Sequence, residues 1–382
     1  MNKRAQPPWL WPQAAYIHVP FCAHHCGYCD FAVATGQDHL VDRYIEALTA
    51  ELSVLREPQP VRTIFLGGGT PSHLDARQLT RLLDAIARWL PFVSGHEFSI
   101  EANPDSIDAD KVKALADNGV NRVSLGAQSF HPSLLRVLER QHDPDQVPRA
   151  VDIIRRRIEN VSLDLIFGVP GQTLSEWQAD LQQALRLEPS HLSTYGLTYE
   201  KGTRLWKQRQ RAELQPLAEA DELGLYLCAI DILEAAGFEH YEISNFARSA
   251  RRCRHNEVYW ANHAYFGFGM GAARYVQSRR ELNTRDLHAY IKRALAGESV
   301  TWQSELLPPE ERARETMAIQ LRRAEGIKRS SFHEQTGYKL DALAGIAITR
   351  LAGLGLLLDD SENVWLTRKG KSVADTVTRE LL

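Results

Sequence analysis

The segment YIHVPFCAHHCGYCDF, from Tyr16 to Phe31, contains three of the five cysteines of the chain, in the spacing C-x3-C-x2-C. Three cysteines within eight residues, beside a glycine and a charged aspartate, do not form a packed apolar face. The spacing therefore indicates that Cys22, Cys26 and Cys29 are ligands rather than core thiols. An odd cysteine count without a signal-peptide pattern predicts a cytoplasmic protein with reduced thiols.

Two kinds of metal site compete for the three thiols. Structural zinc normally takes four ligands from two paired clusters, and the sequence has no second cluster, although His24 and His25 stand between the first two cysteines. Thiolates also select iron–sulfur clusters, and three cysteines would leave one iron of a 4Fe–4S cluster open to an outside ligand. The sequence favours the iron–sulfur cluster, and zinc stays an alternative.

Apolar stretches alternate with amphipathic helical patterns over the first half of the chain. Strands are predicted at 14–19, 62–69, 97–102, 121–127, 162–168 and 191–197. Helical patterns lie between them, at about 41–55, 79–90, 108–118, 145–159 and 174–187. This order predicts an α/β fold of parallel βα units in a barrel-like sheet.

Polar residues and glycines follow the predicted strands where each strand ends, which is where parallel sheets collect their chemistry. The glycines of GGGTPS (67–72) follow the second strand and would let the backbone approach a ligand. Glu101 ends the third strand, Gln128 ends the fourth, and Asp164 lies within the apolar fifth. A helix cap for Glu101 and a loop amide for Gln128 are alternatives, but the joint placement predicts one ligand site.

The cysteine motif, with Tyr28 before its last thiol, resembles the signature of the radical SAM superfamily. The blocks YIHVPFC, GGGTPS, EANP, GAQSF, LERQH and LDLIFGVPGQT resemble the subfamily of oxygen-independent coproporphyrinogen III oxidases and their relatives over nearly the whole chain. The resemblance implies a partial (β/α)6 barrel, a 4Fe–4S cluster on the three cysteines and S-adenosylmethionine (SAM) on the open iron. It implies a SAM pocket of Tyr16, Tyr28, Gly68, Gly69, Thr70, Glu101, Gln128, Arg140, Asp164 and Thr198.

Two features separate the chain from the oxidases of this subfamily. Phe31 stands where the oxidases carry a further cysteine, and only fifteen residues precede Tyr16, where the oxidases have a longer extension. In addition, HNEVYW (255–260) resembles the H-N-x-x-Y-W signature of the HemW-type radical SAM heme chaperones. This resemblance implies heme binding and delivery of heme to acceptor proteins such as respiratory cytochromes.

His255 is the predicted heme ligand, because imidazole is a common axial ligand of heme iron. Four arginines just upstream would suit the heme propionates: Arg248, Arg251, Arg252 and Arg254. Ala273, however, stands in GFGMGAAR (267–274) where this family usually has a histidine. An oxygen-independent coproporphyrinogen III oxidase, or a radical SAM enzyme acting on another substrate, is the alternative function.

Three domains are predicted. They are a radical SAM partial barrel (1–200), an elaboration that carries the HNxxYW block (201–305) and a winged-helix-like C-terminal domain (306–382). The net charge of −3 and the lack of a dense basic helix argue against a nucleic-acid partner. Without an apolar run of membrane-spanning length, at most peripheral membrane contact is expected. The protein is expected to be a monomer or a cluster-dependent dimer.

Overall fold

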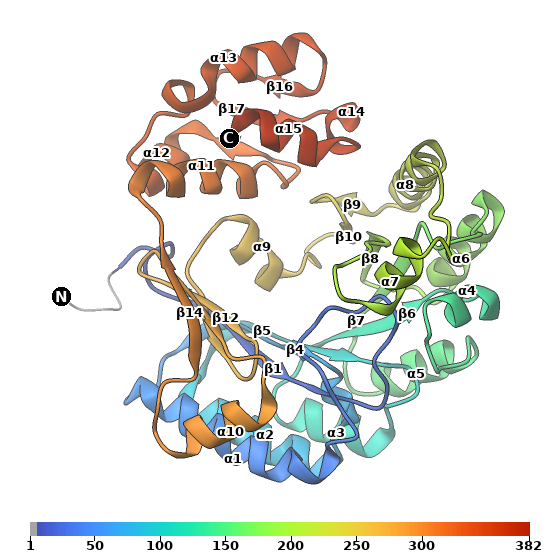
Figure 1. The fold of residues 1–382 in the computed structure, drawn as a ribbon, viewed down its shortest axis with the longest axis vertical. Helices are drawn as coiled ribbons and strands as arrows, with labels where there is room; N and C mark the ends of the chain where they lie inside the picture. The colour runs from blue at the N-terminus through green and yellow to red at the C-terminus, as the bar shows by residue number, and fades with distance from the viewer. Residues whose placement is uncertain (1–5) are drawn as a thin grey trace.

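A nine-stranded sheet organises the larger part of the molecule (Figure 1), in the order β11-β1-β4-β5-β6-β7-β8-β10-β9. The structure is a computed structural model that describes residues 6–382. The sequence predicts that the N-terminal stretch is not a signal peptide, and the first five residues of that stretch lie outside the described part. The six central strands are β1 (Ala14–Val19), β4 (Val61–Gly68), β5 (Phe92–Ala102), β6 (Arg122–Gln128), β7 (Asn160–Phe167) and β8 (His191–Gly196). All six run parallel and do not close into a ring, which confirms the predicted partial barrel.

Helices connect these strands and cover the outer face of the sheet (Figure 1). They are α1 (Val41–Leu52), α2 (Ala76–Trp89), α3 (Ala109–Asp117), α4 (Pro132–Val137), α5 (Gln146–Arg155) and α6 (Leu174–Arg186). Their ends follow from local sequence: Asp75 with Gln78, and Thr173 with Glu176, form capping boxes at the starts of α2 and α6. Helix α3 is followed by Gly119, whose φ of 85° a glycine adopts without strain.

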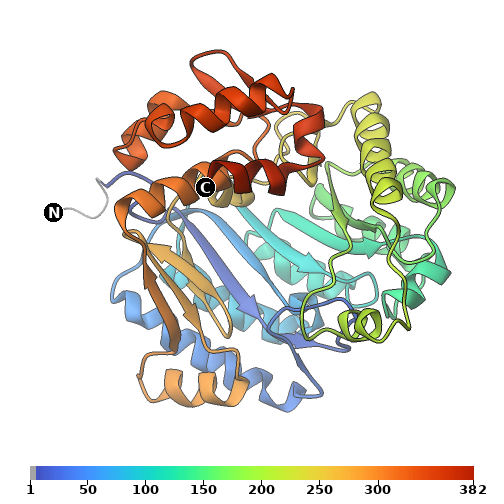
Figure 2. The ribbon, with the colours of Figure 1, turned by 45° about the horizontal axis from the view of Figure 1, so that its top comes forward.

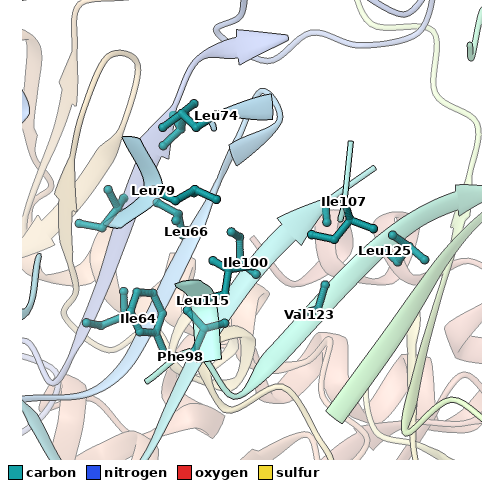
Figure 3. Packing of buried hydrophobic residues seen from close by; sticks show 14 of the residues in the cluster. Ile64, Leu66, Leu74, Leu79, Phe98, Ile100, Ile107, Leu115, Val123 and Leu125 are labelled. Atoms are coloured by element: carbon teal, nitrogen blue, oxygen red, sulfur yellow. The ribbon is translucent and has the colours of Figure 1, made fainter. Parts of the chain in front are cut away.

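The main hydrophobic core lies between the sheet and these helices (Figure 3). Ile64 and Leu66 of β4 and Phe98 and Ile100 of β5 are completely buried, because alternate residues of a strand face the same side. Leu79 of α2 packs over them from the helical layer. Burial of these side chains stabilises the packing of the helices on the sheet, and so holds the strands with their ends in place.

The middle of the chain extends the sheet at both edges. Its strands β9 (Glu239–His240) and β10 (Asn245–Ala247) pair antiparallel beyond β8, whereas β11 (Phe266–Phe268) pairs parallel with β1. A separate antiparallel sheet consists of β12 (Ala273–Val276), β13 (Arg279–Asn283) and β14 (Thr301–Leu306). The remaining elements are α7 (Arg204–Gln210), α8 (Glu219–Ala235), α9 (Arg254–Trp260), α10 (Leu287–Leu295), and the short paired strands β2 (Phe21–Cys22) and β3 (Ala34–Thr35).

A C-terminal unit with its own hydrophobic core lies above the main sheet in the view of Figure 2. Its helices are α11 (Pro309–Gln320), α12 (Arg329–Thr336), α13 (Leu340–Gly353), α14 (Arg368–Lys371) and α15 (Ala374–Leu381). Its sheet consists of β15 (Ile327–Lys328), β17 (Asn363–Leu366) and β16 (Leu357–Asp359), in that order. Helices followed by a small hairpin form the winged-helix-like tail that the sequence predicts, whereas the exact domain boundaries stay predictions.

Helix α9, which carries HNEVYW, lies between the main sheet and the C-terminal unit and contacts β4 and α11 (Figure 1). Within residues 6–382, every helix is too short or too polar to cross a membrane.

Removal of the Trp177 side chain, the largest buried side chain of α6, tests the main hydrophobic core. Trp177 is fully buried, lies 5.6 Å from the Phe167 ring between centroids, and donates its indole N–H to the Leu225 carbonyl at 2.9 Å. Trp177→Ala should lower the free energy of unfolding by about 3–5 kcal/mol in urea titrations followed by circular dichroism. Trp302→Ala is the matched control, because Trp302 is 73% exposed and its loss should leave stability unchanged. Equal stability of the two variants would contradict the assigned core.

Candidate functional site

A cavity of about 1040 Å³ opens at the carboxyl ends of the parallel strands. Its walls contain all three motif cysteines and all ten residues predicted to bind SAM: Cys22, Cys26, Cys29, Tyr16, Tyr28, Gly68, Gly69, Thr70, Glu101, Gln128, Arg140, Asp164 and Thr198. These residues come from seven separate stretches of sequence. The structure thus brings the predicted set to one place, while the role of each residue stays a prediction.

Two of the thiols are tied together by a chain of hydrogen bonds. Cys22 Sγ lies 3.2 Å from Thr70 Oγ1, which accepts a hydrogen bond from Asn103 Nδ2 at 3.1 Å. Asn103 Oδ1 in turn accepts from Arg140 Nη2 at 2.7 Å, and Arg140 Nη1 reaches Cys26 Sγ at 3.6 Å. Asn103 was not among the predicted site residues, although it stands in the EANP block with Glu101.

The donor chemistry of this loop fits an iron–sulfur cluster. Burial raises the pKa of the Cys22 thiol to about 11 and that of Cys29 to about 11, so both thiols are neutral until a metal binds. A coordinated metal ion deprotonates such thiols outright. Within residues 6–382, no three His, Cys, Asp or Glu side chains converge on a point the size of one ion, whereas a cluster takes each thiolate on a different iron.

The glycine block after β4 forms a cradle that only glycine permits. A Cβ on Gly68, whose φ is 117°, would lie 2.6 Å from the His18 ring, and one on Gly69 would lie 2.5 Å from the Pro20 carbonyl oxygen. The two glycines therefore let this backbone pack closely on β1 and the start of the thiol loop, and both also line the cavity. Glu101 Oε2 accepts the Gly68 N–H at 2.9 Å, which leaves the other carboxyl oxygen for a ligand. A cradle with this shape fits an amino acid moiety such as the methionine part of SAM.

Two partly buried carboxyl groups, Glu101 and Asp164, line the cavity. Burial raises the pKa of Glu101 to about 7, the Gly68 N–H opposes this shift, and the Asp164 charge adds to it. Burial likewise raises the pKa of Asp164, whose oxygens accept from Ser124 Oγ at 3.1 and 3.0 Å. Buried carboxyl groups held in this way suit the ammonium and hydroxyl groups of a nucleoside-containing ligand.

Gln128 reaches the cavity through a local backbone distortion. The pairing of β6 with β7 shifts register between Gly126 and Gln128, and Gln128 has a φ of 62°. Non-glycine residues rarely adopt this left-handed conformation, and it is concentrated at functional sites. A Cβ on Gly126 would lie 2.9 Å from the Gln128 amide nitrogen, so the glycine provides room for the amide.

His255, the predicted heme ligand, lies behind the cavity wall. It is 0% exposed, its Nε2 lies 2.8 Å from the Tyr259 hydroxyl, and its Nδ1 lies 3.0 Å from Thr63 Oγ1. Burial, with the Arg122 charge, lowers the pKa of His255 to about 3, so the ring is neutral. Tyr259, one turn further along α9, faces the cavity. Coordination of iron by His255 therefore requires its contact with Tyr259 to open.

Of the four arginines upstream of His255, Arg251, Arg252 and Arg254 form ion pairs. Arg252 Nε donates to Glu239 at 3.0 Å, and Arg251 Nη2 approaches Glu159 at 3.3 Å. Within HNEVYW, the residues that line the two cavities are Asn256, Tyr259 and Trp260. The residue pattern alone gave no signal for this arrangement, because it depends on how α9 docks on the sheet.

An open parallel sheet with three thiols and a glycine cradle at its carboxyl edge defines a radical SAM scaffold. The family model of the Radical SAM superfamily matches residues 16–184, and that of the HemN C-terminal domain matches residues 307–373. Over its full length the fold resembles coproporphyrinogen III oxidase (HemN) from Escherichia coli, with a TM-score of 0.85 at 23% identity and 92% coverage of that chain. This likeness concerns the fold alone.

Curated relatives identify the family. The chain is 37% identical to the heme chaperone HemW of Lactococcus lactis over 374 residues, 97% of each chain. It is 38% identical to the heme chaperone HemW of Bacillus subtilis over 371 residues, 96% of this chain and 98% of that one. It is also 38% identical to the heme chaperone HemW of Escherichia coli over 68% of this chain and 69% of that one. The chain belongs to the HemW family of heme chaperones.

The raised pKa of Glu101 predicts a dependence of stability on pH in the protein without cofactors. An ordinary glutamate titrates at 4.5 and Glu101 at about 7, so the folded protein holds this proton more tightly than the unfolded chain. The contribution of Glu101 to stability is therefore fully present below pH 4.5 and is lost as the pH rises to 7. Relative to Glu101→Gln, the wild type should lose roughly 3 kcal/mol of unfolding free energy between pH 4 and 8.

Urea titrations at several pH values measure this difference. Glu46→Gln, at an exposed position of α1, is the matched control and should follow the wild type at every pH. Parallel curves for the wild type and Glu101→Gln would show that Glu101 titrates normally.

Proposed function

We propose that this protein binds heme and delivers it to acceptor proteins, on a radical SAM scaffold that carries a 4Fe–4S cluster and SAM. The observation that carries this proposal is identity of 37–38% over 96–97% of the chain to proteins named heme chaperone HemW. The HNEVYW segment supports it, because its aromatic side chains border open space. Phe31, where the resembling oxidases have a cysteine, is 59% exposed beside the thiol loop and offers no further ligand.

The cavity residues would divide between the two cofactors. Cys22, Cys26 and Cys29 would hold the cluster, and Arg140 would compensate its negative charge. Gly68, Gly69 and Thr70 would contact the methionine part of SAM, and Tyr16 and Tyr28 would lie beside it. The rest of the SAM pocket would be lined by Glu101, Gln128, Arg140, Asp164 and Thr198. Once bound, a reduced cluster can donate an electron to SAM, while the protein orients both and excludes water.

The finer parts of the function are also proposals. Respiratory cytochromes are the proposed acceptors, and any membrane contact would run through the acceptor or the protein surface. We place the protein in the cytoplasm, as a monomer or a cluster-dependent dimer, and without a nucleic-acid partner. His255 is retained as the proposed axial ligand, subject to the opening of its contact with Tyr259.

The test is anaerobic reconstitution with iron and sulfide, followed by heme titration monitored by absorbance. The wild type should take up the cluster and bind heme in a one-to-one ratio. The Cys22/Cys26/Cys29→Ala triple variant should lose the cluster, measured as iron and sulfide content, and bind heme within about twofold of the wild type because the heme site is separate. Cys228→Ala, at a half-buried cysteine of α8, is the control and should keep both.

Two outcomes would favour the alternative functions. Turnover of coproporphyrinogen III to protoporphyrinogen IX, with SAM and reductant, would identify an oxidase rather than a chaperone. A protein that forms the cluster and never binds heme would point to a radical SAM enzyme with another substrate.

A separate comparison tests His255. His255→Ala should weaken heme binding at least about tenfold, because an axial ligand contributes more than 1.4 kcal/mol. Tyr259→Phe removes only the hydroxyl that occupies Nε2, and should bind heme as tightly as the wild type or more tightly. Unchanged heme affinity in His255→Ala would remove this residue from the heme site. Because His255 is buried, the thermal midpoint of each variant should be recorded beside its affinity.

A further inference from the structure

A second cavity, of about 460 Å³, lies between α9, the β12–β13–β14 sheet and α11. Its walls are mainly aromatic and apolar, and the residues that matter here are Tyr259, Trp260, Tyr265, Tyr275, Leu282 and Ile319. Its size is within the range of small-molecule sites, and such sites are mostly apolar with a few placed polar groups. The cavity adjoins the cofactor cavity, because Tyr16, Asp30, Phe31 and Tyr259 line both.

The aromatic walls suit a flat ring system. Tyr259 and Tyr265 meet edge to face, with ring centroids 4.6 Å apart, and the backbone of Tyr265 pairs with that of Tyr275. Among the residues that the structure describes, the indole N–H of Trp260 is buried without a hydrogen-bond partner. A buried donor left unpaired is costly, and such groups are usually satisfied by water or a ligand. Trp260 and Tyr259 are the last two residues of HNEVYW.

Two arginines stand in the wall of this cavity, in different electrostatic situations. Arg280 is held by Glu315 at 2.8 Å and by Glu305 at 3.5 Å, so its charge is compensated. Arg285 has a side chain that is 56% exposed; it donates to the Asp30 carbonyl, while the nearest Asp30 carboxylate oxygen lies 3.9 Å away. Its guanidinium therefore keeps N–H groups for an anion at the rim.

A flat apolar ring with carboxylate groups on one edge matches this combination of aromatic walls and a cationic rim. We infer that this second cavity is the site that takes heme, with the porphyrin between α9 and the β12–β14 sheet and a propionate on Arg285. The inference rests on the proposed function and adds the location of the cargo. It places the heme beside the SAM pocket, with Tyr16 and Tyr259 as the shared wall.

Ala273 gives access to the same cavity from the sheet side. It lines the cavity on β12, opposite Leu282 of β13, and its small side chain leaves room. Ala273→Trp would fill the space that the porphyrin occupies, whereas Ala273→Ser would keep it open. The two substitutions at one position separate the effect of volume from that of altered strand pairing.

The experiment uses the full chain, reconstituted with its cluster, and titrates it with ferric heme and with heme dimethyl ester. Arg285→Gln should weaken heme binding about tenfold and abolish the preference for heme over its ester, because a charge-assisted contact to a carboxylate is lost. Ala273→Trp should abolish binding of both probes. The controls are Arg279→Gln, an exposed arginine of the same sheet, and Ala273→Ser; both should stay within about twofold of the wild type.

The outcomes separate this inference from the proposed function. If the wild type does not bind heme, the proposed function fails and the inference fails with it. If the wild type binds heme, and both Arg285→Gln and Ala273→Trp bind it equally well, the function stands and the assigned site is wrong. If Ala273→Trp does not keep its cluster and thermal midpoint, the assigned site is judged from Arg285→Gln alone. A variant that still prefers heme over its dimethyl ester as strongly as the wild type would then show that the site is wrong.

Discussion

The arrangement of this protein depends on one constraint: six parallel strands end at the same edge of a sheet that does not close. Parallel strands direct their carboxyl ends to one side, so loops far apart in sequence meet there. Because the sheet stays open between β11 and β9, the edge surrounds a cavity of about 1040 Å³ instead of a packed centre. The thiol loop after β1 and the glycine cradle after β4 follow directly from this geometry.

A single carboxylate connects that sheet to the segment that resembles the heme-chaperone signature. Glu97 of β5 accepts the backbone N–H groups of Arg254 and His255, at 3.0 Å each, at the first turn of α9. A helix of seven residues is not stable alone, and a negative charge at its N-terminus stabilises it. The position of Tyr259 and Trp260 is therefore fixed from the main sheet, even though α9 also contacts α11.

Local patterns predicted much of this architecture, because strands, capping residues and the cysteine spacing are written in neighbouring residues. The ten predicted SAM residues could be found from the sequence, because each lies close to the end of a predicted strand or in a block that resembles the family. In the structure all ten line one cavity. Other features depend on contacts between distant segments. Asn103 is important only because Thr70 and Arg140 meet it, and His255 is buried only because α9 docks on Thr63. The second cavity likewise needs β12, α9 and α11 together.

The wall between the two cavities shows how such distant contacts define the site. The hydroxyl of each shared tyrosine lies within hydrogen-bond distance of a buried histidine: Tyr16 at 3.0 Å from His18, and Tyr259 at 2.8 Å from His255. His18 Nε2 faces the Ala32 carbonyl at 2.7 Å and must donate to it, so Nδ1 accepts the hydroxyl proton of Tyr16. Burial lowers the pKa of His18 to about 4, which keeps this ring neutral at physiological pH.

Both tyrosines are thus fixed by neutral, buried histidines, His18 on β1 and His255 on α9. Displacement of either ring breaks a buried hydrogen bond to its histidine, which costs about 1–3 kcal/mol. Tyr16 and Tyr259 therefore form a fixed boundary, so the two cavities share a wall and remain separate.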